Sequence, residues 1–142
     1  MKFMLCPLVL AIIPAVASSA DPCQRVPFDP EVPAGLEGAY ELIGRDAMTG
    51  KPYLGNLQVS LGKNSYLLKR TVRGTVVSGE AWFEGCGADR VKSLFVTYRT
   101  SPVTQQVCYL SRNFDNDVQA TCKSDQGKTQ GRGLESWFQK HG

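Results

Sequence analysis

The sequence predicts an all-β fold: a small antiparallel barrel or strongly curled sheet of seven to eight strands, stapled by disulfides. Short runs rich in Val, Leu, Tyr, Phe and Thr alternate with clusters of Gly, Asp and Asn at intervals of about 8 to 12 residues. Along these runs no apolar period of 3.6 residues persists, which argues against helices. After loss of the expected leader the cysteine count is even, as is typical of disulfide-bonded exported domains.

Residues 1–20 have the pattern of a secretory signal peptide. Lys2 supplies a positive start, Phe3 to Val16 is apolar, and Ser18-Ser19-Ala20 is a small-residue cleavage site. The apolar run is about 14 residues long, whereas a membrane-spanning helix needs roughly 20. Cleavage after Ala17 satisfies the same rule, so two cleavage sites remain open.

Cleavage after residue 20 leaves 122 of the 142 residues, enough for one domain with a modest core. It removes Cys6 and Lys2, so four cysteines and 15 basic against 13 acidic side chains remain. So small a positive excess predicts no nucleic-acid partner, and the short apolar run predicts no stable membrane anchor. We therefore expect an exported protein, periplasmic or secreted.

Composition divides the mature chain into four parts. A Pro-rich extended arm is expected at 21–37, a β-barrel-like domain at 38–124, a flexible Gly-rich linker at 125–133 and an apolar segment at 134–142. The last segment is expected to plug the barrel or add a final strand, rather than serve as a docking peptide. The expected strands are Gly38–Arg45, Tyr53–Leu61, Ser65–Arg73, Val76–Phe83, Val91–Arg99, Gln105–Asn113 and Val118–Lys123.

Short turns fix the expected strand register. A two-residue loop at Lys63-Asn64 sets Leu61 opposite Tyr66, so that the apolar faces of the two strands coincide. An equally short following loop sets Leu68 opposite Gly79, and a glycine there suggests a bend or bulge.

In this register Arg70 points inward, opposite Val77. An inward arginine is either a sign that the register is wrong or a functional exception.

The cysteines fit the same register. If the last expected hairpin turns around Phe114-Asp115-Asn116, Cys108 lies opposite Cys122, within reach of a disulfide. Four cysteines allow three connectivities. We expect Cys108–Cys122, which leaves Cys23 to join the arm to Cys86 in a long loop that stabilises the fold by about 4 kcal/mol.

Metal and cofactor chemistry has little support in the sequence. The single histidine, His141, is the penultimate residue, where a frayed tail is the expected setting. Paired cysteines cannot bind zinc or act as nucleophiles. Asp115-Asn116-Asp117 lacks the glycine and the distal glutamate of a calcium loop and is typical of a turn. We expect no metal site, no cofactor and no catalytic residue.

Paired carboxylates are the remaining enzymatic hypothesis. A small hydrolase would need two acids about 5 to 10 Å apart in a cleft. In this register Glu80 is expected on the solvent face of its strand, where a carboxylate is an ordinary surface group rather than a catalytic one. The candidates are Glu37, Glu41, Glu80 and Glu84.

A basic and aromatic set is the best candidate for ligand binding. Three basic residues lie on or just after one expected strand, and a tyrosine and an arginine lie together at the end of another. Such a surface would suit an acidic or carbohydrate partner, whereas a positive strand edge that resists sheet-to-sheet aggregation explains the same residues. The set is Lys69, Arg70, Arg73, Tyr98 and Arg99.

Part of the chain resembles known exported domains. Gly38-Ala39-Tyr40, Pro52 to Val59 and Tyr66 to Arg70 resemble a strand pattern of exported bacterial β-rich domains of unknown function. In size, export and disulfide count the chain is also similar to the periplasmic lysozyme inhibitors, whose small barrels insert a Ser- and Gly-containing segment into the enzyme's cleft. Here Ser78-Gly79 falls inside an expected strand, so the resemblance assigns no inhibitory residue.

Together these features predict a noncatalytic exported binding module of the bacterial envelope, with inhibition of a secreted hydrolase such as lysozyme as one form. The alternative is a lipocalin-like carrier of a small apolar or anionic ligand, in which the inward Arg70 meets an anionic head group. The expected partner is thus an unknown protein or a small ligand. The two hypotheses differ in whether the barrel interior is filled.

Overall fold

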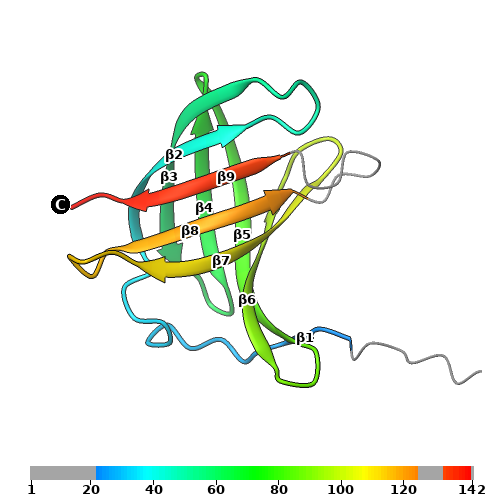
Figure 1. The fold of residues 1–142 in the computed structure, drawn as a ribbon, viewed down its shortest axis with the longest axis vertical. Coiled ribbons are helices and arrows are strands. Elements are labelled where there is room, and N and C mark those ends of the chain that lie inside the picture. The colour runs from blue at the N-terminus through cyan, green and yellow to red at the C-terminus, as the bar shows by residue number, and fades with distance from the viewer. Residues whose placement is uncertain (1–21, 125–132, 142) are drawn as a thin grey trace, which may run out of the picture.

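The computed structural model describes residues 22–124 and 133–141, which form a closed antiparallel barrel of eight strands with one additional short strand (Figure 1). The all-β prediction is confirmed. The predicted signal peptide at 1–20 and nearly all of the predicted linker lie outside the described residues. The strands are β1 (Gln24–Arg25), β2 (Gly38–Arg45), β3 (Pro52–Leu61), β4 (Tyr66–Val72), β5 (Thr75–Cys86), β6 (Val91–Tyr98), β7 (Thr104–Arg112), β8 (Val118–Ser124) and β9 (Leu134–Gln139).

From β2 to β9 each barrel strand pairs with its neighbours in sequence, including β5 with β6, and the pairing of β9 with β2 closes the circle. β9 therefore lies between β8 and β2. Thus the C-terminal apolar segment forms the final strand, one of the two packing roles predicted for it. Within the described part of the chain no helix is long and apolar enough to span a membrane.

The predicted hairpin registers are correct. Leu61 faces Tyr66, Leu68 faces Gly79 and Cys108 faces Cys122. The β4–β5 turn has positive φ at both central residues, 50° at Arg73 and 76° at Gly74, as a two-residue turn that follows the twist of the strands requires.

The barrel has two distinct ends. We call "arm end" the end that carries the turns β3–β4, β5–β6 and β7–β8, because the segment before β2 runs across it (Figure 1). We call "mouth" the opposite end, which carries the turns β2–β3, β4–β5 and β6–β7. The arm is not extended throughout, as the sequence had suggested: Gln24 and Arg25 pair with β5 as β1, and residues 30–35 form turns.

Both predicted disulfides are present. Cys108–Cys122 bridges β7 and β8, and Cys23–Cys86 ties the start of the arm to the end of β5. Two disulfides are consistent with an oxidising, exported location.

Side chains fill the middle of the barrel. The ring of Trp137 is fully buried and meets Tyr40 edge-on, with ring centroids 6.0 Å apart. At the arm end Phe28 packs edge-on against Tyr66 at 5.1 Å, and the Tyr40 hydroxyl donates to the Leu36 carbonyl at 2.6 Å. The buried core consists of Leu36, Tyr40, Leu42, Leu57, Val59, Tyr66, Leu68, Ala81, Leu94, Val96, Tyr98, Cys108, Val118, Ala120, Cys122 and Trp137.

Candidate functional site

The barrel wall divides the predicted ligand-binding set. Arg70 and Tyr98 point into the barrel near the mouth, whereas Lys69, Arg73 and Arg99 are exposed or partly exposed outside the core. The sequence had suggested one basic and aromatic surface. Strand alternation separates Lys69 from Arg70 because successive side chains point to opposite faces of a sheet.

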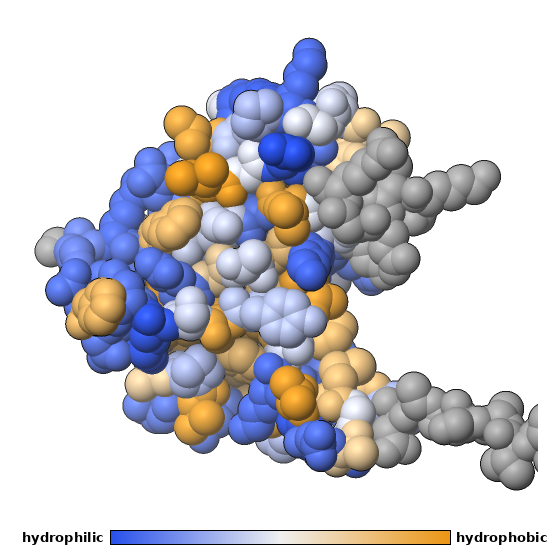
Figure 2. All heavy atoms as spheres, viewed as in Figure 1, coloured by the Kyte–Doolittle hydropathy of each residue, from blue (hydrophilic) through white to orange (hydrophobic). Residues whose placement is uncertain are grey.

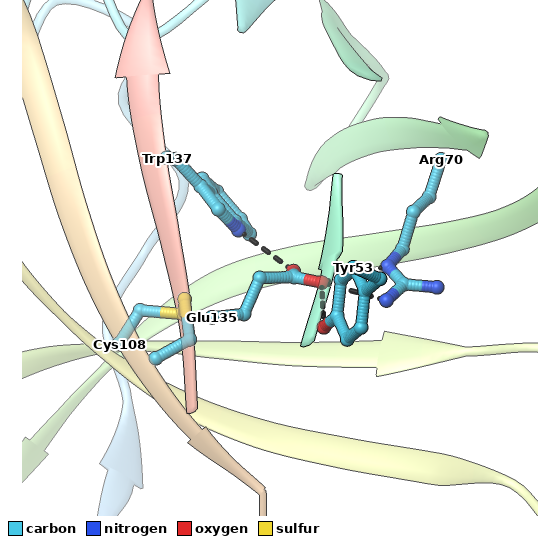
Figure 3. The surroundings of a disulfide bond; sticks show 6 residues. Tyr53, Arg70, Cys108, Glu135 and Trp137 are labelled. Atoms are coloured by element: carbon cyan, nitrogen blue, oxygen red, sulfur yellow. Dashed lines mark hydrogen bonds and ion pairs between the residues drawn. A yellow bond between two sulfur atoms is a disulfide. The ribbon is translucent and has the colours of Figure 1, made fainter. Parts of the chain in front are cut away.

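Inside the mouth, Arg70 forms an ion pair with Glu135 of β9 (Figure 3). The Arg70 Nη2 and Nε atoms donate to Glu135 Oε2 at 2.7 Å and 2.9 Å. The Tyr53 hydroxyl donates to the same oxygen at 2.6 Å, and Trp137 Nε1 donates to Oε1 at 2.9 Å. The Glu135 side chain is completely buried, so its charge depends on these four donors, two of which belong to the positively charged guanidinium.

Two tyrosine rings flank the guanidinium of Arg70. Its central carbon lies 5.1 Å from the ring centroid of Tyr53 and 5.4 Å from that of Tyr98, within the range of cation–π contacts.

Each of these rings occupies space left by a glycine on the paired strand. Gly44 faces Tyr53, and Gly79 faces Tyr98. A Cβ on Gly44 would overlap the Tyr53 ring, and one on Gly79 would lie 2.7 Å from Cδ1 of Tyr98. Gly79 pairs with both neighbouring strands in unbroken register, so it accommodates a ring rather than marking the bend or bulge suggested by the sequence.

The ionisation of the cluster follows from burial and charge. Burial raises the pKa of Tyr98 well above its ordinary value, and the Glu135 carboxylate raises it further. Burial and then Glu135 likewise raise the pKa of Tyr53. For Arg70, burial is the largest influence and alone would lower the pKa, but the charge and hydrogen bonds of Glu135, together with Tyr53 and Tyr98, outweigh it and the pKa rises. The cluster therefore holds a guanidinium and two neutral phenols at neutral pH.

The outward basic residues have separate contacts. Arg99 forms a 3.4 Å ion pair with Glu80 on the outer wall, and Arg73 donates to the Pro52 carbonyl at 3.2 Å in the β4–β5 turn. Lys69 faces Ser78 across β4 and β5 and is exposed. Exposed pairs of this kind contribute little to stability.

Glu135 and Tyr53 were not among the predicted site residues. Glu135 lies in a segment whose apolar neighbours Leu134, Trp137 and Phe138 draw attention to packing. The signal that could have found it is alternation: Glu135 shares a strand face with Trp137, so a buried Trp137 implies a buried Glu135 that needs a cation.

A larger hollow lies at the arm end, between the arm and side chains of the barrel strands that pack against the core. This arm groove has a volume of about 680 Å³. Its centre is apolar, with Phe28 of the arm facing Phe83 and Leu110 of the barrel, and polar groups such as Asn64 and Lys92 also line it. On the face drawn in Figure 2, by comparison, hydrophobic side chains are scattered among hydrophilic ones.

Two groups of potential metal ligands occur in the described part of the chain. Cys23 and Cys86 lie near Glu84, but both sulfurs are in a disulfide. Asp115, Asp117 and His141 gather at the surface of the arm end, where His141 Nε2 lies 2.9 Å from Asp117 Oδ2. His141 is therefore held against the β7–β8 turn, whereas the sequence had suggested a frayed tail.

Comparison of the chain with protein-family models, with curated proteins and with solved structures gives no significant match.

Proposed function

We propose that this chain is a noncatalytic binding module of the bacterial envelope that binds a protein partner through the arm groove. The observation that carries the proposal is the contrast between the packed barrel interior and the open arm groove. The middle of the barrel is packed and the inward Arg70 is neutralised by Glu135, whereas the arm groove is open, apolar and several times larger than the cavity at the mouth.

The anatomy of the arm groove supports a protein partner. Specific interfaces combine an apolar, well-packed centre with a polar rim. Phe28, Phe83 and Leu110 supply an apolar centre, and Asp29, Asn64 and Lys92 supply polar groups. The Cys23–Cys86 disulfide and the Phe28–Tyr66 contact hold the arm in place, so little order has to be gained on binding.

The carboxylates give no support to a hydrolase. Glu80 pairs with Arg99, and Glu84 accepts a hydrogen bond from Trp82 Nε1 at 2.8 Å. In the described residues, the arm groove, the mouth cavity and two further hollows are each lined by at most one of the glutamates Glu37, Glu41, Glu80 and Glu84.

Inhibition of a secreted hydrolase such as lysozyme is one form of this function. Ser78 and Gly79 do not form an inserting loop, because both lie within β5 between two paired strands. An inhibitory contact would instead use the arm and the groove beside it.

The test is capture of a partner by the immobilised, oxidised mature chain from an envelope extract. The captured protein is identified by mass spectrometry, purified, and titrated against the chain. Leu110→Glu places a charge in the groove and should abolish binding. Leu54→Glu is the control for a leucine 66% exposed on the outer face of β3. Because Leu110 also packs against the core, circular dichroism must show that both variants keep the fold. Equal binding by both variants would refute the groove as the docking surface.

A second candidate is a carrier that holds a small apolar molecule in the same groove. The groove's volume of about 680 Å³ falls within the range of small-molecule sites, and this volume is the specific support for the carrier. The carrier predicted from the sequence, with Arg70 facing a head group inside a roomy barrel, has no such support because the core side chains occupy the interior. Native mass spectrometry of the captured material distinguishes a bound protein from a bound apolar molecule.

A further inference from the structure

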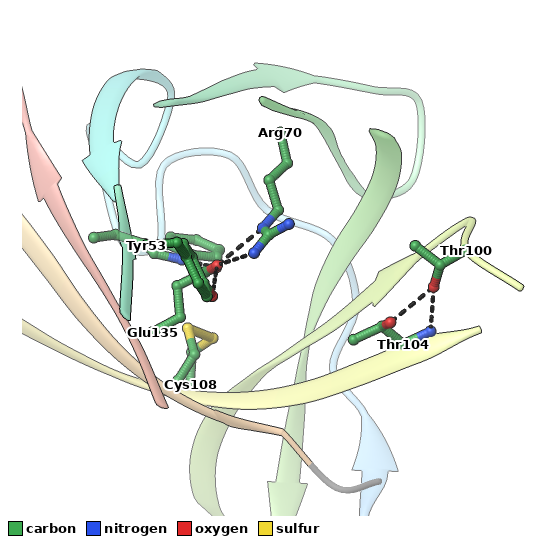
Figure 4. A network of polar contacts seen from close by, with 8 residues as sticks. Tyr53, Arg70, Thr100, Thr104, Cys108 and Glu135 are labelled. Atoms are coloured by element: carbon green, nitrogen blue, oxygen red, sulfur yellow. Dashed lines mark hydrogen bonds and ion pairs between the residues drawn. A yellow bond between two sulfur atoms is a disulfide. The ribbon is translucent and has the colours of Figure 1, made fainter. Parts of the chain in front are cut away.

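A small polar cavity opens at the mouth, at the opposite end of the barrel from the arm groove. Its volume is about 150 Å³. A cavity of this volume holds about six heavy atoms, because benzene fills an engineered cavity of similar size. Arg70 lies on one side and Thr100 and Thr104 on the other (Figure 4); Tyr53, Tyr98 and Gln106 also line it.

Two buried polar atoms at this cavity have no hydrogen-bond partner among the residues that the structure describes. They are the hydroxyl oxygen of Tyr98, a residue 2% exposed, and Oε1 of Gln106, a residue 4% exposed. Leaving such groups unpaired is costly, and native proteins rarely do so without a bound molecule to satisfy them. Together the two atoms offer a phenolic donor and an amide acceptor.

Arg70 adds a further donor. Its Nε and Nη2 atoms are committed to Glu135, and its remaining nitrogen, Nη1, makes no hydrogen bond to any residue in the described ranges. Figure 4 shows one guanidinium nitrogen directed away from Glu135, toward the side of Thr100 and Thr104. The Arg70 side chain is 19% exposed, so solvent reaches it.

The charges around the cavity cancel. Glu135 offsets Arg70, and at the rim Asp46 offsets Arg45. A neutral ligand group is therefore favoured over a carboxylate, which would approach Glu135 without a free counter-charge. A neutral group that both accepts from Arg70 and Tyr98 and donates to Gln106 is an amide with an N–H.

We propose that the mouth cavity binds an acetamido group. The carbonyl oxygen accepts from Arg70 Nη1 and the Tyr98 hydroxyl, the N–H donates to Gln106 Oε1, and the methyl group lies against the tyrosine rings. Acetamido groups occur on N-acetylated amino sugars and on acetylated peptides, which share this chemistry. The site is independent of the arm groove and of any protein partner bound there.

The experiment is an NMR titration of the oxidised mature chain with four probes. N-acetylglucosamine and N-acetylalanine methylamide carry the acetamido group, whereas glucosamine and acetate do not. The expected result is saturable shifts of the Arg70 and Gln106 side-chain signals with one or both acetamido probes only. Response to the sugar alone assigns an amino-sugar source, and response to the peptide alone assigns a peptide source. Binding of acetate alone, or of no probe, overturns the proposal.

A pair of variants separates binding from folding. Tyr98→Phe removes the unpartnered hydroxyl in the cavity and keeps the ring, and should weaken binding about tenfold, the effect of one lost hydrogen bond. Tyr66→Phe is the matched control, because the Tyr66 hydroxyl is also buried and has no partner within 22–124 and 133–141, but it belongs to the arm end. Gln106→Met, which removes the acceptor, gives a second measurement. Unchanged affinity in Tyr98→Phe and Gln106→Met, or an equal loss in Tyr66→Phe, overturns the assignment.

Discussion

Removal of Arg70 should expose how strongly the fold depends on the buried ion pair. In Arg70→Met a side chain of similar length replaces the guanidinium, and the fully buried Glu135 carboxylate keeps only the Tyr53 and Trp137 donors. Breaking one partner of a buried pair typically costs about 3 to 5 kcal/mol. For a chain of this size about 4 °C of Tm accompanies each kcal/mol, so Tm should fall by roughly 12 to 20 °C.

The companion variants are Glu135→Gln and the double variant. Glu135→Gln leaves Arg70 partly solvated, since its side chain is 19% exposed, and should cost less than Arg70→Met. In the double variant no charge is buried unpaired, so its stability should exceed the sum of the single losses by about 1 to 3 kcal/mol. Urea denaturation followed by circular dichroism, with the disulfides intact, measures all four proteins.

The pH dependence of Arg70→Met gives an independent check. An unpaired buried carboxylate favours its protonated, neutral form, because burial penalises the charged form. The penalty is therefore small in acid, where the carboxyl group is protonated in both the folded and the unfolded chain, and it grows as the pH rises toward 7. A loss under about 1 kcal/mol that is equal at pH 4 and pH 7 would refute the reasoning.

Three other perturbations follow from the structure. Replacing Cys23 and Cys86 by Ser removes a 63-residue loop closure and should lower the free energy of unfolding, measured by urea titration, by about 4 kcal/mol. This is about 1 kcal/mol more than the expected loss on removing the 14-residue closure between β7 and β8, and equal losses would argue against the loop-entropy account. Burial raises the pKa of Tyr53 and Tyr98 above the ordinary value of 10, so stability should be complete below about pH 10 and fall as the pH rises further; a flat profile from about pH 9 to 11 would contradict this. Gly79→Ala places a Cβ 2.7 Å from the Tyr98 ring and should lower the free energy of unfolding by about 1 to 3 kcal/mol. A Tm equal to that of the wild type would show that the ring has room to move.

The sequence by itself determined the fold class, the hairpin registers and the disulfide pairing of this protein. Strand alternation, the two-residue turn at Arg73-Gly74 and the spacing of Cys108 and Cys122 are local properties, and each places residues that are close in the chain. These properties sufficed for the all-β fold, the hairpin registers and the disulfide of the last predicted hairpin, after which Cys23–Cys86 followed by elimination.

The composition of the mouth was decided only by the tertiary structure. Arg70 and Glu135 are 65 residues apart and meet because β9 closes the barrel beside β2, a pairing that no turn specifies. Sequence alternation could place Arg70 inward but could not supply its partner. The partner depends on how far the strands are staggered around the closed barrel, and this stagger brings Tyr53, Arg70, Tyr98 and Glu135 from four strands to the same level.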